Sequence, residues 1–121
     1  SVDAMNYLKP LPLGHSVCVE TYISGTGKKS MEVFCKVVGE DVLNGERYLA
    51  ATSFWTFVAL PRDGETDFTV DAIVPETDEE KFICSGYEER RKARLEQLGR
   101  QEALMDHITV VKPWNLEESE S

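Results

Sequence analysis

The stretch "HSVCVETYISGTGKKSMEVFCKVVGE", residues 15–40, decides the fold, because it has the pattern of two β-strands joined by a turn. One face of its first half carries Val17, Val19 and Thr21. The same spacing in its second half places on one face Met31, Val33, Cys35 and Val37. Alternation with a period of two is typical of strands in a sheet. Gly25 and Gly27 lie between the halves and are residues that tight turns favour. The stretch therefore predicts an antiparallel hairpin.

Further strand signals lie on both sides of this hairpin. Residues 1–8, "SVDAMNYL", have a strand pattern, and the two prolines and the glycine within residues 9–15 predict a loop after them. Asn44-Gly45 is a strong turn signal, and a long, mostly apolar run at residues 47–60 follows it. Strands joined by short turns predict a meandering antiparallel sheet.

The C-terminal third has the character of a helix. Thr77 is followed three residues later by Glu80, which is the spacing of a capping box at a helix start. Residues 77–98 are rich in charged helix formers, and Gly99 is the expected end. The apolar stripe of this helix is thin and predicts a peripheral position; it consists of Phe82, Tyr87, Leu95 and Leu98.

These elements predict an α+β domain over residues 1–98, followed by an extension over residues 99–121. The acidic end of this extension, residues 117–121, is expected to be disordered. A long apolar sheet needs a cover on its inner face, and the predicted helix is too polar to provide it. Either the sheet pairs with another subunit, or a covering helix lies outside this sequence.

Composition and charge argue against several classes of protein. The formal net charge of −9 argues against nucleic acid as a partner, because such binding needs a basic face. The three cysteines form no Cys-x-x-Cys pair, which argues against a zinc site and a disulfide framework. Cys18 and Cys35 are expected to be buried free thiols. The sequence has no membrane-spanning run and no signal-sequence pattern, so we expect a cytoplasmic protein.

Few residues point to catalysis. We expect structural or surface roles for the two histidines, His15 and His107, because no recognisable nucleophile motif accompanies them. The basic run "ERRKAR", residues 89–94, is expected to be a solvated helix face, although it could supply arginine to a shared phosphate site.

The best local site is the stretch from Gly27 to Ser30. Its glycine lets a ligand approach the backbone closely, and Lys28 and Lys29 offer point charges to a phosphate. A solvated hairpin tip explains the same residues equally well. On these residues alone, both interpretations stay open.

Four blocks of the sequence resemble the hotdog-fold acyl-CoA thioesterases, in particular the small bacterial acyl-CoA hydrolases and the brain-type cytosolic acyl-CoA hydrolases. The blocks are "SVDAMNYLKPLPLGH", "TGKKSMEVFCKV", "NGERYLAATSFWTFVAL" and "VPETDEEK". They stand in the order of the family and extend over most of the chain.

The resemblance implies an antiparallel sheet wrapped around a long central helix, in homodimers that pair through the sheet and assemble as a trimer of dimers. It also implies hydrolysis of fatty acyl-CoA to the free acid and CoA, with no cofactor besides the CoA of the substrate. Near the nucleotide end of CoA, the family has the segment that matches Gly27, Lys28, Lys29 and Ser30, which are thus the expected CoA contacts.

The resemblance further assigns a strand bordering the acyl tunnel to the segment that contains Asn6 and Tyr7. Asn6 replaces the aspartate of the family, so no charge-dependent role is expected for it. Family members also carry a central helix ahead of the segment that matches Ser1, and this helix holds the acid thought to activate water or attack the thioester. We therefore expect the catalytic carboxylate to lie upstream of these 121 residues, which would be the C-terminal part of a longer domain.

Three hypotheses follow. The first is an acyl-CoA thioesterase. The second is a non-catalytic module that binds acyl-CoA or CoA, for example the regulatory half of a tandem thioesterase. The third is a purely structural dimerisation unit, which only the apolar sheet favours.

Overall fold

The structure, a computed structural model, describes residues 2–62 and 69–115. The chain divides into two compact units, residues 1–87 and residues 88–121. The first unit holds an antiparallel sheet and a short helix, and the second holds nearly all of a long helix. The acidic end that was expected to be disordered lies outside the described residues.

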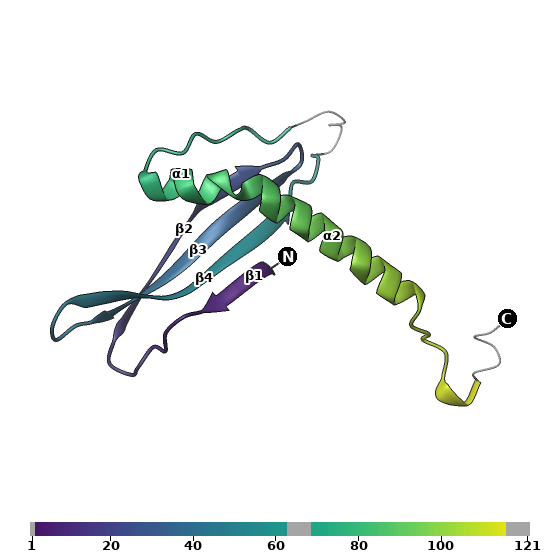
Figure 1. The fold of residues 1–121 in the computed structure, drawn as a ribbon, viewed down its shortest axis with the longest axis horizontal. Helices are drawn as coiled ribbons and strands as arrows, with labels where there is room; N and C mark the ends of the chain where they lie inside the picture. Colours follow the sequence, from purple (N-terminus) through teal and green to yellow (C-terminus); the bar gives the residue numbers. More distant parts are fainter. Residues whose placement is uncertain (1, 63–68, 116–121) are drawn as a thin grey trace. The chain divides into compact units, whose positions relative to one another are not determined.

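The sheet has four strands in the order β1-β4-β3-β2 (Figure 1). Their bounds are Val2–Tyr7 for β1, Ser16–Thr26 for β2, Ser30–Asp41 for β3 and Glu46–Val58 for β4. The predicted hairpin is confirmed, because β2 pairs with β3 in antiparallel fashion, with Val19 opposite Val37. The first strand pairs with β4 and forms one edge of the sheet.

The turn between β3 and β4 is built as the Asn44-Gly45 signal predicts. Gly45 has a φ of +73°, a left-handed conformation that favours glycine. The side-chain oxygen of Asn44 accepts a hydrogen bond of 2.8 Å from the backbone N–H of Glu46. The backbone N–H of Gly45 donates to the carbonyl of Asp41 over 2.7 Å.

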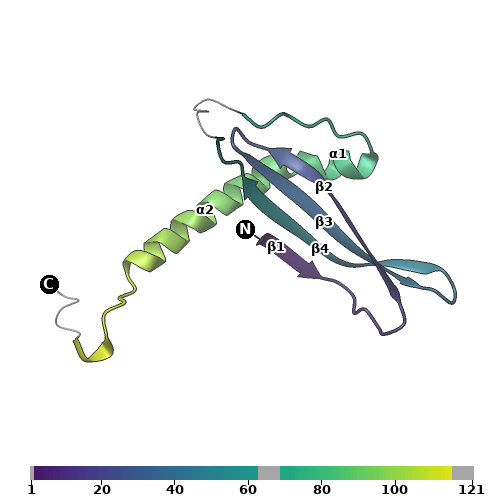
Figure 2. The same cartoon turned by 180° about the vertical axis from the view of Figure 1, so that it is seen from behind.

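One side of the sheet, which we call the covered face, contacts the helix α1, Asp78–Ser85 (Figures 1 and 2). Phe34 is only 5% exposed there and packs between the rings of Tyr22 and Phe54, with centroids at 5.3 and 5.1 Å. The carboxylate of Glu79 accepts hydrogen bonds from the hydroxyl of Tyr22, over 3.0 Å, and from the ammonium of Lys36, over 2.8 Å. Glu79 thus ties α1 to two strands.

These contacts shift the pKa values of the groups involved. The hydrogen bond from Lys36 lowers the pKa of Glu79, and the bond from Tyr22 adds to this effect. The pKa of Tyr22 is raised, first by burial and then by its hydrogen bond to Glu79. The pKa of Lys36 is also raised, chiefly by its hydrogen bond to Glu79.

The opposite side of the sheet, which we call the open face, carries the alternating apolar residues of the predicted hairpin. Its members include Val17, Val19, Ile23, Val33 and Val37. Within the described part of the chain, Val19 is 60% exposed and Val17 is 52% exposed. The alternation of the strands is therefore confirmed, and the open face has the lack of cover that the sequence indicated.

The cysteines agree only in part with the sequence. All three are free, as predicted. Cys18, however, is exposed and Cys35 is half-buried, so the expectation of buried thiols is wrong. Cys18 pairs with Val38, next to the Glu20–Lys36 pair. Of these positions, Lys36 is bonded to α1, whereas Cys18 remains in contact with solvent.

The start of α1 is the predicted capping box. The hydroxyl of Thr77 accepts a hydrogen bond from the N–H of Glu80 over 3.1 Å, and the carboxylate of Glu80 accepts one from the N–H of Thr77 over 3.4 Å. The expectation of one helix over residues 77–98 is wrong, because α1 ends before Gly86, whose N–H donates to the carbonyl of Ile83.

The second helix, α2, spans Tyr87–Asp106 and passes through Gly99, so the expected stop at Gly99 is also wrong. A glycine within a helix costs only about 1 kcal/mol relative to alanine, which a helix of this length can absorb. The two helices have a single buried residue among those described, Tyr87, in line with a peripheral position. A 3₁₀ turn at Pro113–Asn115 follows. None of the described helices is both long and apolar enough to cross a bilayer.

Candidate functional site

The hairpin tip between β2 and β3 contains the four residues predicted to contact CoA. The N–H of Gly27 donates to the carbonyl of Ser30 over 2.9 Å and closes the turn. The carbonyl of Lys28 accepts from the N–H of Val70 over 2.8 Å, and that of Lys29 from the N–H of Ala59 over 2.7 Å. Both lysines are exposed. The tip is thus fixed through its backbone, while two cationic side chains reach solvent.

The two glycines of this hairpin serve close packing. Neither has a left-handed φ, so the expected role in turn conformation is not what the structure shows. A Cβ on Gly25 would overlap the ring of Tyr87. A Cβ on Gly27 would lie 2.8 Å from the hydroxyl oxygen of Ser30 and 3.6 Å from that of Tyr87. Sequence reasoning assigned Tyr87 to a thin helical stripe and missed this contact.

A buried polar pair lies in β2 and β3 close to the tip. Glu32 is 4% exposed, and the hydroxyl of Ser24 donates to its carboxylate over 2.7 Å. Ser24 itself is fully buried. Buried carboxylates need such partners, because an unsatisfied charge is costly away from water. The burial of Glu32 favours a structural role over contact with a substrate.

An apolar hollow of about 510 Å³ lies on the sheet and includes the predicted tunnel residue Tyr7. Its lining consists of Tyr7, Leu8, Lys9, Pro10, Leu11, Val37, Ala50 and Ala51. Tyr7 stands opposite Ala51 in the β1–β4 pairing and is 83% exposed. Asn6, the other predicted tunnel residue, stands opposite Thr52 and is not among the lining residues. Neighbouring residues of a strand point to opposite faces. Tyr7 therefore faces the hollow, whereas Asn6 faces the other side of the sheet.

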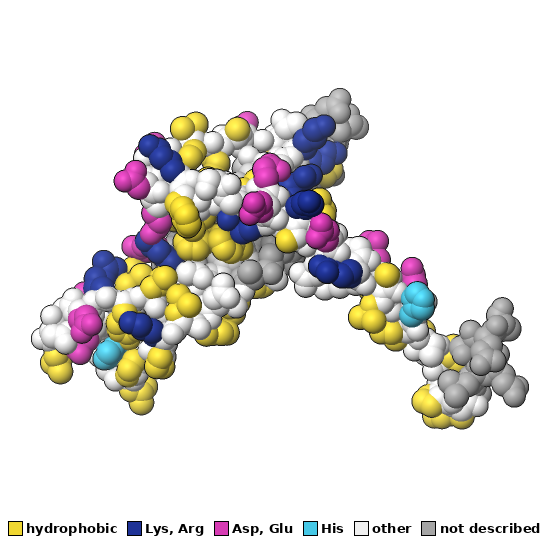
Figure 3. Space-filling model, viewed as in Figure 1, with side chains coloured by type: hydrophobic (Ala, Val, Ile, Leu, Met, Phe, Trp, Pro, Cys, Tyr) yellow, Lys and Arg dark blue, Asp and Glu magenta, His cyan; other side chains and the backbone are white. Residues whose placement is uncertain are grey.

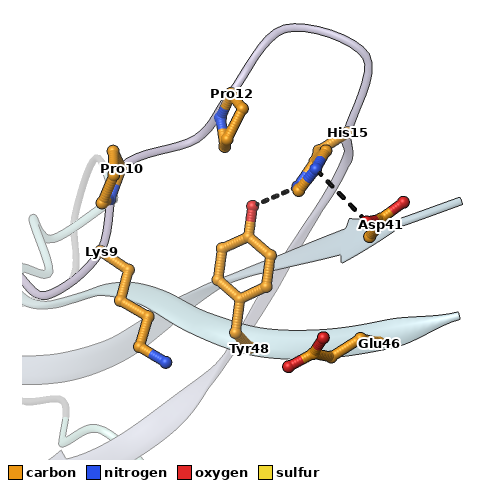
Figure 4. Close-up of a pocket in the computed structure, with 7 residues that line it drawn as sticks. All are labelled: Lys9, Pro10, Pro12, His15, Asp41, Glu46 and Tyr48. Carbon is orange, nitrogen blue, oxygen red and sulfur yellow. Dashed lines mark hydrogen bonds and ion pairs between the residues drawn. The ribbon is translucent and has the colours of Figure 1, made fainter. Parts of the chain in front are cut away.

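A second, more polar cavity of about 250 Å³ lies beside the loop that follows β1 (Figure 4). In the space-filling view, hydrophobic side chains gather at this end of the sheet beside acidic and basic ones (Figure 3). The ring nitrogen Nδ1 of His15 lies 2.7 Å from the hydroxyl of Tyr48, and its Nε2 lies 3.9 Å from the carboxylate of Asp41. A Cβ on Gly39 would overlap the ring of Tyr48. His15 thus fastens the loop to the sheet, which fits its expected structural role.

The hairpin tip is cationic and the hollow is apolar, and they lie at different positions along β3, the tip beside Ser30 and the hollow beside Val37. No cluster of three His, Cys, Asp or Glu side chains able to hold a metal ion was found among the residues that the structure describes. His107, the second histidine, bonds through Nδ1 to the carbonyl of Ala103 in the last turn of α2.

Comparisons with known proteins identify the family. Residues 1–45 match the family model of the thioesterase superfamily. The uncharacterized acyl-CoA thioester hydrolase YkhA of Bacillus subtilis is 42% identical over 114 residues, which are 94% of this chain and 66% of that protein. A threonine-to-alanine mutant of an acyl-CoA hydrolase from Staphylococcus aureus matches with a TM-score of 0.81 and 30% identity, over 89% of this chain and 67% of that one. The chain belongs to the acyl-CoA thioesterase family.

Two further structures extend this likeness within the thioesterases. The S. aureus acyl-CoA hydrolase in complex with butyryl-CoA, CoA and CoA disulfide has a TM-score of 0.79 and 30% identity, over 88% of this chain and 65% of that one. A hexameric apo acyl-CoA thioesterase has a TM-score of 0.71 and 29% identity, over 80% of this chain and 62% of that one. The predicted hotdog fold is confirmed by these thioesterases, and the chain spans about two thirds of their length.

Proposed function

We propose that the protein to which this chain belongs hydrolyses fatty acyl-CoA thioesters to the free acid and CoA. The observation that carries this proposal is the exposed lysine pair on a backbone-fixed hairpin tip, in a chain whose net charge is otherwise strongly negative. Its chemistry is supported by the similar S. aureus hydrolase, which binds butyryl-CoA and CoA.

The hairpin tip is the proposed seat of the phosphates of CoA. Lys28 and Lys29 supply the positive charges and Ser30 supplies a hydroxyl, while Gly27 would contact the ligand through its backbone. The apolar hollow is the proposed place of the acyl chain, with Tyr7 on its wall and Ala51 opposite. A role for Asn6 at the tunnel stays a prediction.

The attacking carboxylate is proposed to come from outside these 121 residues. The chain covers 66% of the length of its B. subtilis relative, which leaves room for a central helix that would cover the open face. A carboxylate placed there would either activate water or attack the thioester carbonyl itself, and backbone amides would stabilise the oxyanion.

We further propose a homo-oligomer in the cytoplasm, with dimers that pair through the sheet and assemble as a trimer of dimers. The similar thioesterase that is hexameric supports the oligomer.

Thiol release from a panel of acyl-CoAs tests the reaction. The double substitution Lys28→Ala/Lys29→Ala should raise KM about tenfold for acyl-CoA and less for the analogue without the 3′-phosphate, because one charge-assisted contact is worth about 1.5–3 kcal/mol. The matched control is Lys81→Ala/Lys92→Ala, which removes the same charge from exposed helix positions. Equal losses for both substrates would contradict the phosphate assignment.

The alternative is a module that binds CoA without hydrolysing it. The observation in its favour is that Glu32, the acidic residue within β3 nearest the tip, is buried and bonded to Ser24. Binding of CoA without thiol release from any acyl-CoA would support this alternative and overturn the enzymatic proposal.

A further inference from the structure

We propose that Tyr87 is a positioning residue for the hairpin tip, and that its contact with Gly25 sets how strongly the protein discriminates CoA by its 3′-phosphate. This inference rests on the proposed role of the tip as the seat of the CoA phosphates. It adds a residue from the helical region to the recognition of the nucleotide.

The first observation is the packing of an aromatic ring against a glycine. Tyr87 is 8% exposed, the lowest exposure of any large apolar residue in the two helices. Its ring occupies the volume that a side chain on Gly25 would need. Gly25 has an ordinary φ and stands opposite Glu32, directly after an irregularity in the β2–β3 pairing. Glycine is therefore required at this position by the ring and not by the backbone conformation.

The second observation is that the far end of the same ring reaches the tip. The point where a Cβ of Gly27 would lie is 3.6 Å from the hydroxyl of Tyr87 and 2.8 Å from the hydroxyl of Ser30. The Tyr87 side chain thus runs along the hairpin from Gly25 to Gly27. It therefore packs against the hairpin on the side of the covered face.

The third observation is that the ring is itself held from a fixed helix. Glu79, near the start of α1, bonds to Tyr22 and Lys36 of the sheet. Gly86 then caps the end of α1, with its N–H bonded to the carbonyl of Ile83 over 3.2 Å. Tyr87 follows at once and turns its ring onto β2. The ring is therefore anchored from the same face of the sheet that it supports.

The consequence for binding follows from the nature of lysine. A lysine is a point charge on a flexible stem, so its contact with a phosphate depends on where the backbone holds the start of that stem. A tip that moves must be ordered when the ligand binds, and this ordering costs affinity. The loss should be largest for the ligand that uses the most contacts with the tip, which is CoA with its 3′-phosphate.

The experiment measures the Kd of CoA and of 3′-dephospho-CoA by calorimetry on the intact protein, together with the melting temperature. Tyr87→Ala and Gly25→Ala should weaken CoA about tenfold and 3′-dephospho-CoA less than about twofold. Tyr87→Phe keeps the ring on Gly25 and removes only the hydroxyl near Gly27, so it should weaken CoA less than Tyr87→Ala does. The control Gly99→Ala places the same methyl group in open space on α2 and should change neither Kd.

The outcomes separate this inference from the proposed function. If the wild type does not discriminate the two ligands, the phosphate role of the tip fails and the inference fails with it. If the wild type discriminates and Tyr87→Ala lowers only the melting temperature, the ring is structural and the inference alone is overturned. Should Gly25→Ala or Tyr87→Ala fail to fold, Tyr87→Leu keeps apolar bulk without the ring, and an unchanged ratio of the two Kd values in that variant overturns the inference.

Discussion

The two faces of the sheet use the same strands and the same alternation, but they differ in what fixes their side chains. On the covered face, Phe34 is almost fully buried and Lys36 bonds to a helix. On the open face, apolar side chains such as Val19 are largely exposed in the described part of the chain. Alternation assigns a residue to a face, whereas the element above that face decides its burial. On the covered face this element is the short helix α1. None of its own residues is buried, so it covers the face through its polar contacts and through the ring of Tyr87 that follows it.

The largest expected effect is the difference in stability cost between the same substitution, Phe→Ala, on the two faces of the sheet. Phe34→Ala should lower the free energy of unfolding by about 3–5 kcal/mol, because it removes a ring packed between two others. Phe57 stands opposite Met31 on the open face and is 52% exposed, so Phe57→Ala should cost less than about 1 kcal/mol. Urea unfolding of both variants measures the difference. Comparable costs would show that the open face is covered in solution by an element outside these residues.

The second prediction concerns the one tightly packed glycine at the far end of the open face. Gly39→Ala should lower the free energy of unfolding by about 1–3 kcal/mol, because the new methyl group must displace the ring of Tyr48. The displacement should also break the 2.7 Å contact between Tyr48 and His15. Thermal unfolding measures the cost, and Gly99→Ala is the control with the same added methyl group.

A double-mutant cycle sharpens this prediction. In a Tyr48→Ala background the ring is gone, so the added cost of Gly39→Ala should fall well below its cost in the wild type. An equal cost in both backgrounds would mean that backbone conformation, and not the ring, requires glycine at this position.

The smallest expected effect is the pH dependence of the bonds that hold α1. The pKa of Glu79 is lowered in the folded protein, so its contribution is complete above the ordinary glutamate pKa of about 4.3 and is lost as the pH falls through the folded pKa. Glu79→Gln should reduce the loss of unfolding free energy on acidification, as measured by urea unfolding. The reduction should be less than about 1 kcal/mol, because the carboxylate is half-exposed. Glu96→Gln on α2 controls for the loss of one charge, and an equal reduction there would remove the assignment to Glu79.

Much of the fold could be predicted from the sequence because it depends on local signals. Strand alternation located β2 and β3, and Asn44-Gly45 located the turn between β3 and β4. The spacing from Thr77 to Glu80 located the start of α1. Gly86 is a local signal of a weak point in the helical stretch, but the contact that the break permits could not be predicted in this way. The break lets Tyr87 contact Gly25, and such a contact between distant parts of the chain leaves no local pattern.

The site shows the same division. The hairpin tip could be located from consecutive residues, because glycine indicates a turn and lysine a positive charge wherever they stand in the chain. The contact between His15 and Tyr48, which fastens the loop to the sheet, joins residues 33 positions apart. Neither residue has a sequence signal that points to the other. The exposure of Cys18 was missed for a related reason, since the sequence places it on a face but does not tell how far α1 extends.

The ring of Tyr87 also marks where this protein can be divided. Tyr87 is the last residue of the first compact unit, and it is buried against the strand that leads to the tip. A protease that cuts in the arginine-rich stretch at residues 89–94 would leave this ring in place, whereas a chain ended at Gly86 would lose it together with the support of the hairpin. A fragment meant to keep this support of the hairpin must therefore extend at least through residue 87.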